Sequence, residues 1–312
     1  MSVLSAPYFH DEAAAFEKLE SVIWPNGPVC PHCGETEKVY AIKPNVEKRV
    51  RIGLKKCGAC RKQFTVKVGT VFEHGRVPLN KFLQAVYLMC SSKKGVSSKQ
   101  LERTLEVTYK TAWFMAHRIR EAMRSGDLAP FGGNGGAVEV DETFIGREPG
   151  KPVRRAFHHK MKVLTLIDRD TKQARSMVVD NLHPSTLAPI LRENMDREAR
   201  LMTDEAGYYL HIGREFAQHG VVSHRRDEYV NPNDRTIHTN TIEGYFSVFK
   251  RGMKGVYQHC GKQHLHRYLA EYDFRYNHRE KLGVDDRARS DSALCGIVGK
   301  RLMYRDSFST VS

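Results

Sequence analysis

The pattern of apolar and polar positions changes along the chain, from helical spacing before residue 125 to the short runs typical of strands after residue 136. Residues 11–23 place Phe16, Leu19 and Ile23 on one helical face, and a second helical segment opens at residues 78–80. The first part of the chain is therefore expected to be largely helical, and the second part to contain a sheet.

Residues 97–123 predict two helices joined by a short turn. Ser97 or Ser98 caps a segment that ends at Leu105, residues 106–108 turn, and residues 109–123 form the second helix. This is the arrangement of a helix-turn-helix, in which the second helix contacts DNA. The side chains that it would offer are Lys110, Thr111, His117, Arg118 and Arg120. The alternative is a small helical bundle whose cations face water.

A glycine-rich segment, residues 125–136, indicates a linker, and strand-like runs follow it. The expected order is three strands, a helix and a fourth strand, over residues 137–146, 162–168, 175–180, 184–197 and 200–204. This is the opening order of the RNase H-like fold, in which the first and fourth strands are neighbours. Fold order alone does not establish function.

The chain is strongly basic, with a net charge of +14 over 312 residues. Residues 51–124 contain 16 Lys/Arg against 4 Glu and no Asp, a local charge of +12. Such a concentration of cations favours nucleic acid as the partner. No apolar run approaches membrane-spanning length and the N-terminus has no signal pattern, so we expect a soluble protein of a reducing compartment, the cytoplasm, without a membrane partner.

Two Cys-x-x-Cys pairs, Cys30 with Cys33 and Cys57 with Cys60, predict a structural Zn²⁺ site. The total of seven cysteines is odd, which disfavours a disulfide framework. The 23 residues between the pairs slightly exceed the usual ribbon spacing, and a hairpin of residues 38–41 against 50–54 would absorb them. The ribbon is expected over residues 28–68.

Isolated acidic residues in the second half predict a metal-dependent catalytic site. Asp141 lies within the first strand and Asp204 at the end of the fourth, so their carboxylates would converge. Glu243 on a following helix would complete a site for Mg²⁺, and Lys250, two helical turns later, would hold a phosphate. Asn240 is either a site residue or the cap of that helix.

Two further acidic residues lie beside the proposed ligands. Glu142 and Glu205 are expected to point to the opposite side of their extended segments and to serve structure or solvent.

Several motifs in order resemble the ISXO-like transposases of bacterial insertion sequences. The resemblance runs over residues 9–279 and rests on Trp-Pro-Asn-Gly (24–27) with the first cysteine pair, Lys-Thr-Ala-Trp (110–113) with Arg118, Val-Asp-Glu-Thr (140–143), Thr-Asp (203–204), His-Thr-Asn-Thr-Ile-Glu-Gly (238–244) with Phe-Lys-Arg (249–251), and Phe-Arg-Tyr-Asn-His-Arg (274–279). The family has an N-terminal zinc ribbon and a DDE catalytic domain.

The resemblance implies a DNA transposase that cuts and joins strands with Mg²⁺ or Mn²⁺. Asp141 and Asp204 would be the first two metal ligands and Lys250 the associated basic residue, with Arg251 beside it as a further DNA contact. The third position varies in the family between Asn and Glu, and Glu243 is preferred to Asn240 because its charge better serves two cations. The resemblance also implies a bacterial, nucleoid-associated protein, whose expected partners are the terminal inverted repeats, the target DNA and a second copy of the chain.

The expected fold class is α+β and multidomain. The expected divisions are an N-terminal helix and zinc ribbon, a helix-turn-helix region, a glycine-rich linker, an RNase H-like mixed α/β catalytic domain and a C-terminal tail, over residues 1–68, 69–125, 126–136, 137–282 and 283–312. The rival functions are a non-catalytic or domesticated zinc-ribbon regulator and a structure-selective nuclease on the same fold.

Overall fold

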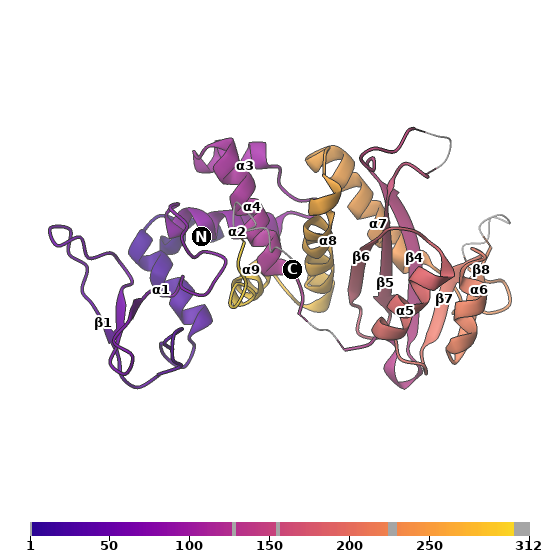
Figure 1. The fold of residues 1–312 in the computed structure, drawn as a ribbon, viewed down its shortest axis with the longest axis horizontal. Coiled ribbons are helices and arrows are strands. Elements are labelled where there is room, and N and C mark those ends of the chain that lie inside the picture. The colour runs from indigo at the N-terminus through magenta and orange to yellow at the C-terminus, as the bar shows by residue number, and fades with distance from the viewer. Residues whose placement is uncertain (1, 127–128, 154–156, 224–229, 303–312) are drawn as a thin grey trace, which may run out of the picture. The chain divides into compact units, whose positions relative to one another are not determined.

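A computed structural model describes residues 2–126, 129–153, 157–223 and 230–302 (Figure 1). The chain divides into two compact units, Met1–Arg124 with Glu280–Ser312, and Ser125–Arg279. Within the described residues, no helix is both long enough and apolar enough to span a bilayer.

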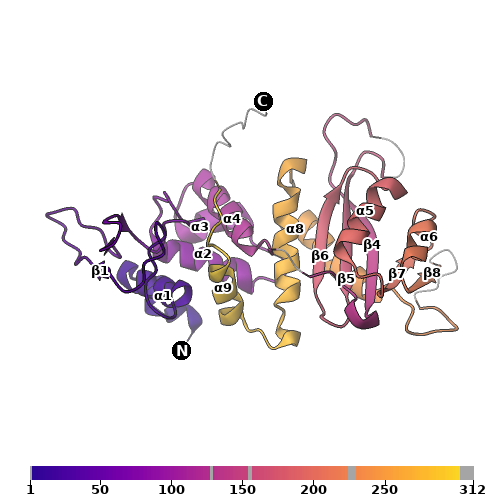
Figure 2. The same ribbon diagram turned by 60° about the horizontal axis from the view of Figure 1, so that its bottom comes forward.

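The first unit is built of helices beside a small ribbon. Its α-helices are α1 Glu12–Ile23, α2 Leu79–Ser91, α3 Ser98–Leu105, α4 Tyr109–Met123 and α9 Asp286–Cys295, with short helical turns at η1 Val3–Ser5, η2 Pro7–Phe9 and η7 Glu280–Leu282. Asp11 caps α1 by accepting from the Ala14 N–H, and Glu12 accepts from the first two N–H groups of α2. The segment after residue 283, expected as a tail, contributes α9, which packs on α1, α2 and α4 (Figure 2).

The helix-turn-helix prediction is confirmed at the level of its elements. Ser97 caps α3, Glu106 turns the chain in the left-handed conformation at φ 50°, and Thr108 caps α4 by accepting from the Thr111 N–H. The helices end at the residues that the capping pattern indicated.

The ribbon is a three-stranded antiparallel sheet of β1 Val39–Ala41, β2 Lys55–Cys57 and β3 Gln63–Phe64. Its register corrects the predicted hairpin, because Val39 pairs with Cys57 and Ala41 with Lys55 rather than with residues 50–54. The chain between these strands forms a longer loop closed by an Asn45–Val50 bridge. Pairing next to the second cysteine pair places β1 against the turn that carries Cys57 and Cys60.

The second unit contains a five-stranded sheet of order β6-β5-β4-β7-β8. The strands are β4 Ala137–Ile145, β5 Met161–Asp168, β6 Ala174–Val179, β7 Arg200–Asp204 and β8 Gln218–Val222. β4, β5 and β6 form an antiparallel meander, whereas β7 runs parallel to β4 and β8 parallel to β7. The predicted neighbourhood of the first and fourth strands is confirmed by the β4–β7 pairing.

Helices cover both faces of this sheet and create two cores (Figure 1). Val138, Val140, Leu164 and Leu166 pack under α5 Pro184–Asn194 and α6 Tyr209–Ile212, which the turn η4 Gly213–Glu215 follows. On the opposite face, Ile145, Val163 and Ile167 pack under α7 Asn240–Gly252 and α8 Lys262–Asn277, which the π-helix η6 Met253–Tyr257 joins. The alternation along β4 therefore decides which of its polar residues meets which helix pair.

The glycine-rich segment is only partly a linker. It contains the 3-10 turn η3 Gly133–Gly135, Phe131 is buried in the core under α5, and the Gly132 N–H donates to Asp168 at 2.9 Å. Residues 127–128 lie outside the described residues. Its later part thus belongs to the packed second unit.

Candidate active site

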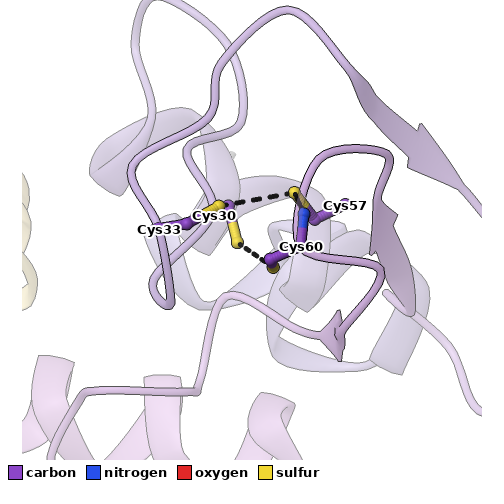
Figure 3. Close-up of side chains that lie close together, drawn as sticks. All are labelled: Cys30, Cys33, Cys57 and Cys60. Atoms are coloured by element: carbon purple, nitrogen blue, oxygen red, sulfur yellow. Dashed lines mark hydrogen bonds between the residues drawn. The ribbon is translucent and has the colours of Figure 1, made fainter.

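The four paired cysteines come together at the base of the ribbon (Figure 3). Their sulfur atoms all lie within 4.8 Å of one another, and none of the four forms a disulfide. Cys30 Sγ lies 3.7 Å from Cys60 Sγ, and Cys33 Sγ lies 3.6 Å from Cys57 Sγ. Sulfur atoms that share one tetrahedral Zn²⁺ stand roughly 3.8 Å apart, given Zn–S bonds of about 2.3 Å. The cysteines therefore fit a closed structural zinc site.

The cluster is tied to the rest of the first unit through α1. Phe64, which lies in the core beside Cys30 and Cys57, meets the Trp24 ring edge-on at 6.0 Å. Lys55 of β2 forms an ion pair with Glu20 of α1 at 2.9 Å. Metal binding and the packing of α1 are thus expected to stabilise each other.

Three carboxylates converge at one end of the large sheet. Oxygen atoms of Asp141, Glu142 and Asp204 all lie within 4.8 Å of one another. The β4–β7 pairing ends at Glu139 and Met202, so the two strands are no longer hydrogen-bonded where these three residues lie. That end of the sheet leaves room for charged side chains inside an otherwise apolar unit.

Glu142 is a site residue that the sequence reasoning placed wrongly. It was expected to face away from the ligands, but its carboxylate lies with Asp141 and Asp204 and accepts from the Tyr209 hydroxyl at 3.0 Å. At this level β4 remains paired with β5 but no longer with β7, and this opening and the long side chain let the Glu142 carboxylate reach the cluster. The one sequence signal for this position is Tyr209, which follows the fourth strand and whose hydroxyl binds the Glu142 carboxylate.

The electrostatics of the cluster favour added positive charge. Burial, followed by the charges of Glu142, Asp204 and Glu243, raises the pKa of Asp141 well above its ordinary value. Burial and then Asp204 raise the pKa of Glu142 to about 7. Among the residues that the structure describes, none forms an ion pair with these three carboxylates. Hard divalent cations, which prefer carboxylate oxygens, would relieve the repulsion.

Glu243 lies near this cluster but outside its tight core. It is in the first turn of α7, accepts from the Thr239 hydroxyl at 3.2 Å, and is close enough for its charge to raise the pKa of Asp141. Asn240 is the exposed first residue of α7, and Thr239 occupies the cap position, so the reading of Asn240 as the helix cap is wrong. The other neighbour, Glu205, accepts from the Ser223 hydroxyl.

A buried ion pair fixes the start of α7 against β4. Glu139, two residues before Asp141, is fully buried and accepts from Arg169 Nε at 2.6 Å and from the Ile242 N–H at 2.9 Å. The same guanidinium donates to the carbonyl oxygens of Thr236 and His238, each at 2.6 Å. This network, which the sequence analysis did not anticipate, sets where Glu243 stands relative to Asp141.

The predicted DNA-contacting residues lie in different settings. Lys250 and Arg251 are exposed on α7, and Lys110 is exposed at the start of α4. The Thr111 hydroxyl lies 2.9 Å from that of Thr108. By contrast, the side chains of His117, Arg118 and Arg120 are at most 8% exposed. The expectation that these three face DNA is therefore corrected, because their positions on α4 belong to the face that packs inward.

Comparisons with known proteins match both units. The family model described as the ISXO2-like transposase domain matches residues 134–277, and the model described as the transposase zinc-ribbon domain matches residues 10–63. A curated relative from Halobacterium salinarum, described as an uncharacterized protein in transposable element ISH50, is 28% identical over 284 residues, which cover 86% of this chain and 91% of the relative.

Two solved structures show weaker likeness. A chain of the simian T-cell lymphotropic virus intasome in complex with PP2A regulatory subunit B56 gamma is 11% identical, with a TM-score of 0.28, 62% of this chain covered and 65% of that one. A chain of the Drosophila P element transposase strand transfer complex is 10% identical, with a TM-score of 0.27, 72% of this chain covered and 66% of that one. The chain spans slightly less than two thirds of each, and TM-scores this low carry no argument.

The two family matches coincide with the two sites described above. The zinc-ribbon match includes all four clustered cysteines, and the other match includes Asp141, Glu142, Asp204 and Glu243. The alignment with the relative from transposable element ISH50 covers 86% of this chain. The chain therefore carries a transposase zinc-ribbon domain followed by an ISXO2-like transposase domain.

Proposed function

We propose that this chain is the DNA transposase of an insertion sequence, which binds the terminal inverted repeats of its element and catalyses metal-dependent strand cleavage and strand transfer. The observation that carries the proposal is the convergence of Asp141, Glu142 and Asp204 in the transposase domain. A protein that only binds DNA gains nothing from clustered anions that would face the phosphate backbone.

In this proposal the carboxylates bind metal ions, and a basic residue of α7 binds the DNA phosphate. Asp141 and Asp204 hold the cations, with Glu243 as the preferred third ligand, and Lys250 holds a phosphate of the bound strand. Mg²⁺ or Mn²⁺ held there supplies activation of the attacking oxygen and stabilisation of the leaving oxygen. Lys250 is seven residues after Glu243, which places it roughly 10 Å further along the same helix face.

The reaction has two steps that need no covalent bond to the protein. Water attacks a phosphodiester at the element end and frees a 3′-hydroxyl. That hydroxyl then attacks a phosphodiester of the target DNA and displaces a target 3′-oxygen. The zinc ribbon and the helix-turn-helix, with Lys110 exposed on α4, bind the inverted repeats, and a dimer or higher oligomer pairs the two element ends.

The test is strand transfer of labelled element-end DNA into plasmid with Mg²⁺ or Mn²⁺. Asp141→Asn and Asp204→Asn should abolish joined product while leaving DNA binding unchanged. Asp170→Asn is the matched control, because Asp170 is an exposed aspartate in a turn of the same unit. Binding without cleavage or joining under either metal would favour a regulator, and cleavage without joining would favour a nuclease.

A further inference from the structure

A second cavity lies in the transposase domain, at the far ends of β4 and α7. Its volume is about 460 Å³, within the roughly 300–1,000 Å³ typical of ligand sites. The lining includes the aromatic residues Phe144 and Phe157, the cations Lys160, Lys250 and Lys254, and Gln258. No acidic residue is among the described residues that line it. The cavity thus combines apolar surface with an excess of positive charge.

The aromatic wall of the cavity has the geometry of a stacking platform. Phe144 at the end of β4 and Phe157 before β5 stack with ring centroids 4.1 Å apart and planes 20° from parallel. Phe157 is nevertheless 44% exposed, so part of its ring remains accessible. The exposed part of this ring offers a flat aromatic face on which a planar group such as a base can stack.

The opposite wall is shaped by an irregular backbone. After α7 the chain forms the π-helix Met253–Tyr257, which carries Lys254, and it ends at Gln258 with φ 58°. A non-glycine residue in this region costs free energy, and both π-helical turns and such strained residues occur preferentially at functional sites. The irregularity places Lys254 and Gln258 on the cavity beside Lys250.

The cavity is within a few nucleotides of the carboxylates. Phe144 is three residues beyond Asp141 on β4, and Lys250 is seven beyond Glu243 on α7. A strand rises about 3.3 Å and a helix about 1.5 Å per residue, so each path is roughly 10 Å long. Stacked bases are separated by about 3.4 Å along one strand, so this distance corresponds to about three nucleotides.

We infer that this cavity receives a single unstacked nucleotide of the DNA strand that is cleaved, with the base against Phe157 and its phosphates near Lys160 and Lys254. Aromatic faces stack on any base, and ammonium groups pair with the phosphates on either side. The inference rests on the proposed function and adds a specific deformation of the substrate. Holding one base out of the helix would fix the register of the strand over the carboxylates.

The test uses element-end duplexes that carry 2-aminopurine at successive positions around the cleaved phosphodiester, because this base becomes brighter when it leaves the stack. Wild type should brighten one position within about three nucleotides of that phosphodiester. Phe157→Ala should remove the signal and weaken binding roughly tenfold, within the range for loss of one base–aromatic stack. Phe157→Tyr should restore both. Lys254→Gln should weaken binding while keeping the brightened position.

Val153→Ala is the matched control, because Val153 is 67% exposed before the same strand but does not line the cavity. Cleavage measured on the same samples separates the two proposals. Wild-type cleavage without a brightened base, or a signal unchanged in Phe157→Ala, overturns the nucleotide pocket and leaves the transposase intact. If Lys254→Gln weakens DNA binding but Phe157→Ala changes neither binding nor brightness, Lys254 contacts a phosphate only, and this result also overturns the nucleotide pocket. Failure to bind or cleave any element-end DNA overturns both.

Discussion

At the scale of single residues, the effects of replacing Glu142 and Glu243 on the reaction rate identify the third metal ligand. Glu243→Gln should lower strand transfer by about 100-fold or more, since loss of a ligand charge removes several kcal/mol of transition-state stabilisation. Glu142→Gln should lower it less, because Tyr209 still holds the side chain. The measurement is the single-turnover cleavage rate against Mg²⁺ concentration. A larger loss in Glu142→Gln would reverse the assignment.

The carboxylate cluster also predicts how stability depends on pH without added Mg²⁺. The folded-state pKa of Glu142, about 7, lies above its ordinary value of 4.5, so folding strengthens proton binding. Its contribution to stability is fully present below pH 4.5 and is lost as the pH rises through 7. The loss should be about 3 kcal/mol.

Urea denaturation of wild type and Glu142→Gln at successive pH values measures this contribution. The buried Asp273, whose pKa burial raises to about 6, adds a dependence of the same sign that both proteins keep. The variant should therefore show a shallower decline, and added Mg²⁺ should flatten the wild-type curve. Parallel curves would show that Glu142 does not titrate in this range.

At the scale of elements, the ion pair between Glu139 and Arg169 is predicted to position α7 for catalysis. Arg169→Lys keeps the charge but cannot reach Glu139, Thr236 and His238 together. Cleavage should fall roughly tenfold or more, because a misplaced Glu243 weakens metal binding. Raising the Mg²⁺ concentration should recover part of the rate, whereas a purely structural defect would leave the metal dependence unchanged.

The control for that prediction is Arg192→Lys. Arg192 forms an exposed ion pair with Glu215 in the same unit. Neither residue belongs to the carboxylate cluster. Its replacement should change stability by less than about 1 kcal/mol and leave cleavage unchanged. Equal losses in the two variants would show that Arg169 has no positioning role.

Sequence periodicity predicted these elements well where the pattern is local. Asp11, Ser97 and Thr108 mark helix starts through their own side chains, and the strands of the meander follow directly from apolar runs. The predicted ribbon register was wrong because the long loop between β1 and β2 turns more than once, at the Asn45–Val50 bridge and at Gly53, so β2 begins only at Lys55. β8 and the Glu139–Arg169 network were missed because they depend on contacts between segments far apart in the sequence. Glu142 was misplaced because β4 and β7 separate beyond Glu139 and Met202, which lets its long side chain reach Asp204 although β4 is still paired with β5.

At the scale of the whole molecule, the proposed function assigns DNA binding to the first unit and chemistry to the second. The first unit contains the stretch with a net charge of +12, and the second contains the carboxylates. Binding that depends on phosphate contacts should weaken steeply with salt. Neutralising Lys110, which is exposed on α4, should reduce the salt dependence of binding by about one ion and leave the cleavage rate at saturating DNA unchanged.

The zinc site gives the sharpest prediction at this scale, because its loss should affect one unit alone. Cys57→Ser removes a buried ligand, so the ribbon and the packing of Trp24 on Phe64 should be lost. Both tryptophans, Trp24 and Trp113, are in the first unit, so tryptophan fluorescence should report the change. Hydrogen exchange in β4 and β5 should remain as in wild type, while binding to element ends falls. Faster exchange throughout the second unit would contradict the independence of the two units.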